Sequence, residues 1–353
     1  MSTETRPPDP GTPTAPPTNR ATMLDVAAAA GVSLKTVSRV VNGEAGVSSA
    51  LATRVNEAVD RLGYRHNLAA SNLRRGRRTA SIGMLVQDLS NDFCSEILRA
   101  VEDRARERGV VVMAASLDED EGRERELVEG LVARRIDGLI MMPTAHELPW
   151  LRADLASGLA VVAVDRRAVV PDMDAVITDN REASAAAVAH LVRHGHRRIG
   201  FIGDTPAIST ARERREGYLD GLRAAGIVPD PALEHLGSRS REEARRVATD
   251  MLAHPEPPTA FFAARNVACE GVLAALQTLG LSHRVAVLGF DELALAELVS
   301  PAVSVMRQDT YEMGKRAIDL LLARLDGDTS PPRVEVVRST LVARGSGEIP
   351  PPR

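Results

Sequence analysis

The chain has 353 residues, of which 44% are hydrophobic, 26% charged and 3% aromatic. This length predicts two or three domains, with cores of Val, Leu, Ile and Ala large enough to fold without disulfides or metals. The sequence contains no run of about 18 apolar residues, which argues against a membrane-spanning protein.

Charge is distributed unevenly along the chain. Residues 20–78 contain ten Lys and Arg side chains against four Asp and Glu, a net charge of +6. The segment 1–19 carries −1 and the whole chain −4, so residues 79–353 carry −9. A small basic domain ahead of a larger acidic one indicates that only the first binds a polyanion.

The first residues and the cysteines indicate the compartment. Residues 1–19 are rich in Pro and Thr and predict a disordered tail rather than a signal peptide. Cys94 and Cys269 lie far apart and outside any C-x-x-C pattern, which fits a reducing environment and argues against a disulfide or a metal site. We therefore expect a cytoplasmic protein that binds no metal.

Three short helices are predicted next, over 23–30, over 34–42 and from residue 49 to about 62. Hydroxyl residues suited to helix N-caps precede them: Thr22, Ser33 and Ser48. Gly31 lies between the first two helices, where a tight interhelical turn needs a residue that tolerates positive φ. The apolar faces of these helices predict a small three-helix core.

The second of these helices has an outer face suited to DNA. Its outward residues are Leu34, Lys35, Thr36, Ser38 and Arg39. Hydroxyls and helix N-termini suit phosphates, and Lys and Arg suit guanine edges in the major groove. This is the pattern of a helix-turn-helix over residues 20–65, although a generic three-helix domain with a solvated cationic face has the same spacing.

From residue 79, apolar runs alternate with helical patterns. The runs are 81–86, 110–115, 137–142, 159–164, 198–203, 259–264 and 284–290. Buried runs separated by helices predict parallel strands in βαβ units. The alternation fits either one large doubly wound domain or two smaller ones.

A resemblance to the LacI/GalR family of bacterial transcription regulators covers about residues 22–345. It is carried by "TMLDVAAAAGVSLKTVSRVVNG" and continues through "IGMLVQDLSNDF", "RRIDGLIMMP", "HGHRRIGFIGD" and "VLGFDE". The resemblance implies an all-α helix-turn-helix domain followed by a periplasmic-binding-protein-like α/β core of two Rossmann-like subdomains. It also implies a hinge helix within 66–78 and a flexible tail over 346–353.

The resemblance assigns DNA contacts residue by residue. By the resemblance, the residues that contact bases are Leu34, Lys35 and Arg39. Those that contact backbone phosphates are Thr22, Thr36, Ser38, Asn42 and Ser48. In the hinge, Leu73 matches a leucine that wedges into the minor groove, with Ala70 beside it. His66 and the pair Ser71-Asn72 depart from the family pattern, which predicts a looser hinge.

The family's core implies where the chain crosses between the subdomains. The crossings are expected near 163–165, 291–294 and 325–328. An N-subdomain would then take 79–163 and 294–325, and a C-subdomain 164–293 and 326–345.

The resemblance also implies an effector pocket in the cleft between the subdomains. Its predicted residues are Asp88, Asn91, Phe93, Asp165, Arg166, Arg212, Arg265 and Asp291. Arg265 stands where many family members have Asn, and its planar guanidinium suits a carboxylate or phosphate. An anionic effector is one reading, and an Arg265 that faces solvent or pairs with an internal acid is the other.

These features together predict a transcriptional repressor rather than an enzyme. We expect a homodimer on palindromic operator DNA, controlled by a sugar, sugar acid or sugar phosphate, with no cofactor and no membrane contact. An α/β enzyme would need a nucleophile–base pair or a cofactor loop, and neither can be placed in the sequence. A solute-binding protein would need a secretory signal and would have no use for residues 22–75.

Overall fold

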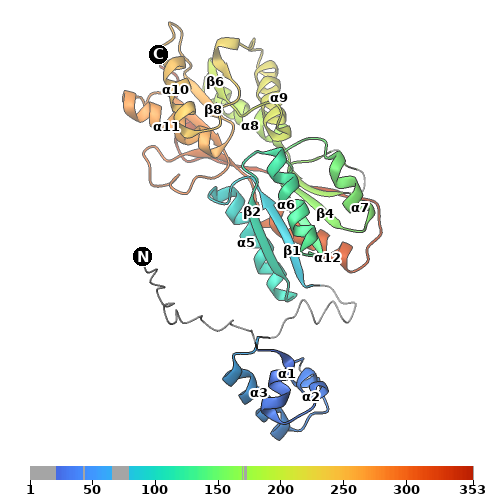
Figure 1. Cartoon of the computed structure of the whole chain (residues 1–353). Helices are drawn as coiled ribbons and strands as arrows, with labels where there is room; N and C mark the ends of the chain where they lie inside the picture. The colour runs from blue at the N-terminus through green and yellow to red at the C-terminus, as the bar shows by residue number, and fades with distance from the viewer. Residues whose placement is uncertain (1–20, 43, 66–78, 169, 171–172, 353) are drawn as a thin grey trace, which may run out of the picture. The chain divides into compact units, whose positions relative to one another are not determined.

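The structure is a computed structural model that describes residues 21–42, 44–65, 79–168, 170 and 173–352. The described residues fall into two units, divided between Arg77 and Arg78 (Figure 1). None of the described helices combines the length with the apolar character that a membrane-spanning helix requires.

The first unit consists of three helices, α1 (Met23–Ala30), α2 (Leu34–Val41) and α3 (Ser49–Leu62). The predicted N-caps are confirmed, because the side chains of Thr22, Ser33 and Ser48 each accept a hydrogen bond from a backbone N–H. Gly31 ends α1 with φ +62°, the left-handed conformation that the interhelical turn was expected to need.

A small apolar core holds these helices together. Its buried members are Val26, Ala27, Ala30, Val37, Val55 and Ala58. Val55 and Ala58 come from α3, so each helix buries one face against the other two. The opposite face of α2 is thereby left to solvent.

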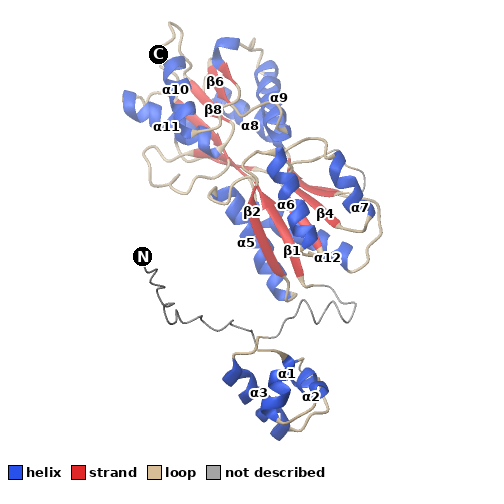
Figure 2. Ribbon diagram, in the orientation of Figure 1, coloured by secondary structure: helices blue, strands red, loops and turns tan. Residues whose placement is uncertain are grey.

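The second unit contains two separate sheets, which settles the choice between one doubly wound domain and two (Figure 2). The first sheet is parallel throughout, in the order β11-β5-β4-β3-β1-β2. Its strands are β1 (Ser81–Val86), β2 (Val111–Ser116), β3 (Gly138–Met141), β4 (Ala160–Asp165), β5 (Asp174–Thr178) and β11 (Val334–Val337). Its helices are α5 (Asp92–Glu107), α6 (Glu121–Ala133), α7 (Arg152–Ala156) and α12 (Thr310–Leu325), with a 3₁₀ turn at Pro149–Leu151.

The second sheet repeats this order as β12-β10-β9-β8-β6-β7, with β12 antiparallel. Its strands are β6 (Ile199–Ile202), β7 (Glu234–His235), β8 (Ala260–Ala263), β9 (Ala286–Phe290), β10 (Ser304–Arg307) and β12 (Thr340–Val342). Its helices are α8 (Asn180–Arg193), α9 (Ser209–Ala224), α10 (Arg241–Leu252) and α11 (Asn266–Leu279), with 3₁₀ turns at Pro231–Leu233 and Ser346–Glu348. The predicted pair of Rossmann-like subdomains is confirmed.

Helices cover both faces of each sheet, because alternate strand residues are apolar on both sides. In the N-subdomain, Ile82 and Met84 pack with α5 and α12, whereas Leu85 belongs to the cluster that includes residues of α6. In the C-subdomain, Phe261 packs with α10 and α11, and Phe262 with α8 and α9. These layers leave the strand ends and their loops for polar side chains.

The predicted crossing points are wrong. The chain leaves the first sheet after β5, at 178–180, returns after β10, at 307–310, and crosses again between β11 and β12, at 337–340. The N-subdomain therefore takes 79–178 and 310–337, and the C-subdomain 180–307 and 340–352. The reason is that β5 and β10 are short strands without a long apolar run, yet each pairs within the sheet of the strand before it.

The prediction of a flexible tail over 346–353 is also wrong for residues 346–349. Ser346 is buried, and its hydroxyl donates to the Val287 carbonyl at 2.6 Å. Glu348 accepts from the Ser304 hydroxyl at 2.8 Å, and the Ile349 carbonyl lies 2.7 Å from His196 Nε2. This segment closes one end of the second sheet's core.

Candidate functional site: a DNA-reading helix and an interlobe cavity

Helix α2 presents two cations side by side. Lys35 and Arg39 are one turn apart and exposed, as is Leu34, while Val37 on the opposite face is fully buried. Among the described residues neither cation forms a salt bridge. The outer face of α2 is therefore positively charged, and its two cations have no carboxylate partner in the part of the chain that the structure describes.

The hydroxyl and amide groups assigned to phosphates lie around the ends of the helices. Thr22 and Ser48 serve as N-caps of α1 and α3, and Asn42 donates to the Ser38 carbonyl at the end of α2. Thr36 Oγ1 lies 2.9 Å from Ser33 Oγ. These contacts fix the ends of the helices, and the phosphate role of each side chain remains a prediction. Ala70 and Leu73, like His66 and the Ser71-Asn72 pair, lie outside the described residues.

A cavity of about 350 Å³ lies between the two subdomains of the second unit. Residues that line it follow the carboxyl ends of strands in both sheets: Gln87 after β1, Glu119 after β2, Asp165 at the end of β4, Asp204 after β6, Arg265 after β8 and Asp291 after β9. Ligand sites of parallel α/β sheets lie at this edge, because the loops there carry polar groups that the core excludes.

The structure brings seven of the eight predicted pocket residues together. They are Asp88, Asn91, Phe93, Asp165, Arg166, Arg265 and Asp291. Arg212 does not line the cavity, and its guanidinium donates to the Pro206 carbonyl at 3.0 Å. Arg214, two residues further along α9, lines it instead. A two-residue step turns a helix by about 200°, so only one of these arginines can face the cleft.

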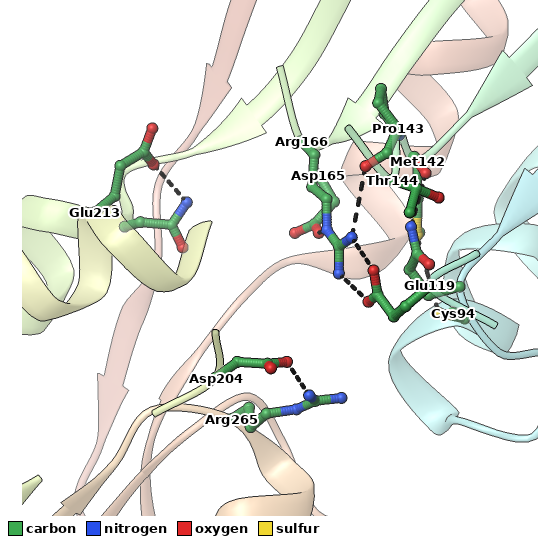
Figure 3. Close-up of polar contacts among 12 residues, drawn as sticks. Cys94, Glu119, Met142, Pro143, Thr144, Asp165, Arg166, Asp204, Glu213 and Arg265 are labelled. Atoms are coloured by element: carbon green, nitrogen blue, oxygen red, sulfur yellow. Dashed lines mark hydrogen bonds and ion pairs between the residues drawn. The ribbon is translucent and has the colours of Figure 1, made fainter. Parts of the chain in front are cut away.

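Three arginines in the cavity wall are paired with carboxylates. Arg166 makes a two-pronged contact with Glu119 at 2.6 and 2.8 Å, and Arg265 forms an ion pair with Asp204 (Figure 3). Arg214 lies 3.6 Å from Asp291. Of the two roles left open for Arg265, the structure shows the internal pairing. The charge of Arg265 is therefore largely neutralised by the protein itself.

Two aspartates occupy matching positions in the two subdomains. Asp165 ends β4 and Asp291 follows β9, and these strands hold the third place in the order of their sheets. Both residues have positive φ, +66° and +74°, which is uncommon and costly for residues other than glycine, although aspartate adopts it more often than most. Such strain is typical of functional positions, where it aims a side chain that relaxed backbone would direct elsewhere.

Among the described residues, the side chains of Asn91 and Asn266 are hydrogen-bonded to each other across the cleft. Asn266 Nδ2 donates to Asn91 Oδ1 at 2.9 Å, which joins the first residue of α11 to the N-cap of α5. Both side chains line the cavity. A ligand that replaces or reinforces this contact would change how the two subdomains are held together.

Several cavity residues were not predicted from the sequence. They are Gln87, Glu119, Asp204, Arg214, Arg239, Arg241 and Asn266. A usable signal exists for Asp204, which directly follows an apolar run in "RIGFIGD", as Asp165 follows "VVAV". Arg239 and Arg241 belong to a loop and a helix start, and no local pattern connects them to the cleft.

The carboxyl of Asp165 gives the protein a testable pH dependence. Burial raises its pKa to about 6, although Arg166 and Arg214 favour the charged form. The folded state thus holds this proton more tightly than the unfolded chain, where the pKa is near 3.8. The stabilisation is complete below the unfolded value and is lost as pH rises through 6.

Asn at position 165 imitates the protonated carboxyl. We therefore expect the Asp165→Asn variant not to lose this stabilisation as the pH rises. Urea unfolding of both proteins between pH 4 and 7 measures it, and the wild type should lose about 1–3 kcal/mol relative to the variant over that range. Other carboxylates titrate in both proteins and cancel in the difference. Parallel stability curves for the two proteins would contradict the elevated pKa.

The fold and the two sites define a class of protein. A helical unit with an exposed cationic helix, joined in one chain to a two-lobed unit with a polar cleft, is a ligand-responsive regulator of transcription. Residues 22–67 match the family described as bacterial regulatory proteins, lacI family, and residues 188–347 match the periplasmic binding protein-like domain.

Individual relatives agree with these matches. The HTH-type transcriptional regulator PtxS of Pseudomonas aeruginosa is 34% identical over 335 residues, which cover 94% of this chain and 97% of PtxS. A structure of the transcriptional regulator CelR–cellobiose complex is 30% identical, with a TM-score of 0.69 over 93% of this chain and 100% of that one. The Lac repressor dimer bound to operator and the anti-inducer ONPF is 25% identical, with a TM-score of 0.80 over 93% and 99%.

The chain belongs to the LacI family of bacterial transcriptional regulators. Its relatives are regulators of transcription rather than enzymes.

Proposed function

We propose that the protein is a homodimeric repressor whose two helix-turn-helix units bind the half-sites of a palindromic operator. Each unit would place α2 in the major groove, with Lys35 and Arg39 at base edges. Both cations are exposed and form no salt bridge with a described residue, which supports this role. The proposal places the protein in the cytoplasm, where a bacterial regulator meets its DNA.

The proposed effector is a sugar or sugar derivative bound in the interlobe cavity. The observation that carries this proposal is that both subdomains supply polar residues to one cavity, including the strained Asp165 and Asp291. Carboxylates and amides arranged in this way suit a ligand with many hydroxyl groups. The CelR relative is described in complex with cellobiose, a sugar.

Effector binding would act by favouring one arrangement of the subdomains over another. A ligand changes such an equilibrium only when it binds the two arrangements with different affinity. The Asn91–Asn266 contact joins the two subdomains across the cleft, and both side chains line the cavity that would hold the ligand. The hinges that precede the second unit would transmit the change to the DNA-binding units.

A homodimer could bury apolar side chains that are exposed in a single copy of the chain. Val111 on the edge strand β2 is 62% exposed, and Leu298, in the loop after β9, is 81% exposed. A second copy of the chain that buried such groups would gain about 25 cal/mol per Å² of apolar surface.

Selection of bound duplexes from a random DNA pool tests the proposal directly. The full-length protein should enrich a palindrome, and a panel of sugars, sugar acids and sugar phosphates should change the yield of that palindrome. Release of DNA identifies an inducer, and stronger binding identifies a corepressor. Recovery of random duplex alone, with and without the panel, would end the proposal.

A further inference from the structure

Two arginines in the cavity wall differ from the rest. Arg239 and Arg241 both line the cavity, and both are exposed. The other three arginines form ion pairs: Arg166 with Glu119, Arg214 with Asp291, and Arg265 with Asp204. Among the described residues, no carboxylate forms a salt bridge with Arg239 or Arg241. Their positive charge is therefore available to a ligand.

The local backbone adds to this positive potential. The two arginines flank Ser240, the N-cap of the twelve-residue helix α10, so backbone N–H groups of the first turn lie at the same place. The acidic residues of that turn have partners of their own, because Glu242 pairs with Arg245. The Ser240 hydroxyl accepts from the Glu243 backbone N–H, and Glu243 accepts from the Arg239 backbone N–H at 3.1 Å. These contacts fix the loop without using either guanidinium.

The N-subdomain wall of the cavity offers the opposite chemistry. Asp165 Oδ1 and Gln87 Oε1 are buried hydrogen-bond acceptors without a partner among the described residues. Gln87 is held in place because its Nε2 donates to the Met142 carbonyl at 2.8 Å. Buried acceptors without partners are costly, and hydroxyl groups of a ligand would satisfy them.

We propose that the effector is a hydroxyl-rich molecule with one anionic group, a carboxylate or a phosphate, which binds between Arg239 and Arg241. Its hydroxyl groups donate to Asp165 and Gln87 across the cavity. This inference rests on the proposed effector site and specifies its ligand class. The anionic group is thus placed at Arg239 and Arg241 rather than at Arg265, which is already paired with Asp204.

Titration calorimetry on the full-length protein tests this with matched ligands. The probes are D-glucose, D-gluconate and D-glucose 6-phosphate, and the corresponding neutral, acid and phosphate forms of ribose and cellobiose. In at least one series, we expect an anionic member to bind about tenfold or more tightly than its neutral counterpart. Because both arginines are exposed, this preference should shrink as NaCl is raised. Preference for the acid or for the phosphate form distinguishes the two anion sources.

The double variant Arg239→Gln/Arg241→Gln should reduce affinity for the anionic ligand about tenfold or more and change that of the neutral one less than twofold. Arg246→Gln is the matched control, because Arg246 lies on the same helix in an exposed pair with Asp250 and does not line the cavity. This control should bind every ligand as the wild type does.

Two outcomes overturn the inference: no anionic member binds, or the double variant binds the anionic ligand as the wild type does. If a neutral sugar still changes operator affinity in either case, the proposed function stands without its anionic ligand. If no ligand of any kind changes operator affinity, the proposed effector control fails as well.

Discussion

Lys35→Ala and Arg39→Ala are each expected to weaken operator binding by about 1–3 kcal/mol, roughly 5- to 150-fold in affinity. Each removes a side chain that can donate to a base edge in the major groove, where one good contact discriminates by that amount. The loss should be concentrated at particular base pairs. Band-shift titrations against the selected operator and its single-base variants measure it.

The structure also predicts what these two substitutions leave intact. Lys35 and Arg39 are exposed and form no salt bridge with a described residue, so thermal unfolding of the variants should match the wild type. Thr36→Ala is the contrasting case, since loss of a phosphate contact weakens all sequences alike and flattens the salt dependence. An equal loss on operator and on random duplex would place Lys35 and Arg39 on the phosphates instead.

Strands were predictable from the sequence where they are buried on both faces. The runs at 81–86 and 159–164 match β1 and β4 within one residue, because a central parallel strand is apolar throughout. The edge strand β11 alternates between exposed and less exposed residues, and β12 has three residues, so neither yields such a run. The third crossing was misplaced because these two strands were missed, as the first two were misplaced because β5 and β10 are short.

The site was predictable where chemistry and strand position coincide. Asp165 and Asp291 follow apolar strands directly, so residue type and place in the chain point to the cleft together. The resemblance was carried over to Arg212, and Arg214 was not considered, because the sequence alone does not show which side of α9 faces the cleft. The rotation of α9 is set by packing: a Cβ at Gly217 would lie 2.1 Å from the Arg181 carbonyl, so α9 can approach α8 only along this face.

The pairing of Arg265 shows a different limit. Its partner, Asp204, is 61 residues away and meets it only because β6 and β8 are neighbours in the sheet. The sequence therefore left open whether Arg265 is free for an anionic effector or paired with an internal acid, and the structure has the ion pair. Arg239 and Arg241, by contrast, matter because no described carboxylate forms a salt bridge with them.

Arg214→Ala is expected to lower the free energy of unfolding by about 3–5 kcal/mol, the range for breaking a buried ion pair from one side. Arg214 is buried, donates to Asn180 Oδ1 at 2.8 Å and to the Ala264 carbonyl at 2.9 Å, and covers the Phe290 ring at 3.9 Å. Its loss leaves the buried Asp291 without a cation. Urea unfolding of the full-length protein provides the measurement.

Arg215→Ala is the matched control on the same helix. Arg215 pairs with Glu234 at a partly exposed site, and such pairs contribute about 0–1 kcal/mol. Adding Asp291→Asn to Arg214→Ala should recover part of the loss, since the double variant no longer buries an unpaired charge. Equal unfolding free energies for the Arg214 and Arg215 variants would show that the buried ion pair contributes no more to stability than the partly exposed one.

The position of Arg214 gives the same substitution a functional effect. Asn180 lies where the chain first enters the C-subdomain, and Asp291 accepts from Gln308 at 2.5 Å, where the chain returns. Arg214 thus connects the cavity wall to two of the three crossings. The Arg214→Ala variant, tested below its unfolding temperature, should bind the operator but show a reduced response to effector. The reason is that the variant lacks the side chain that connects the cavity wall to these two crossings. A full response in this variant would mean that the coupling runs through other contacts, of which Asn91–Asn266 is the first to test.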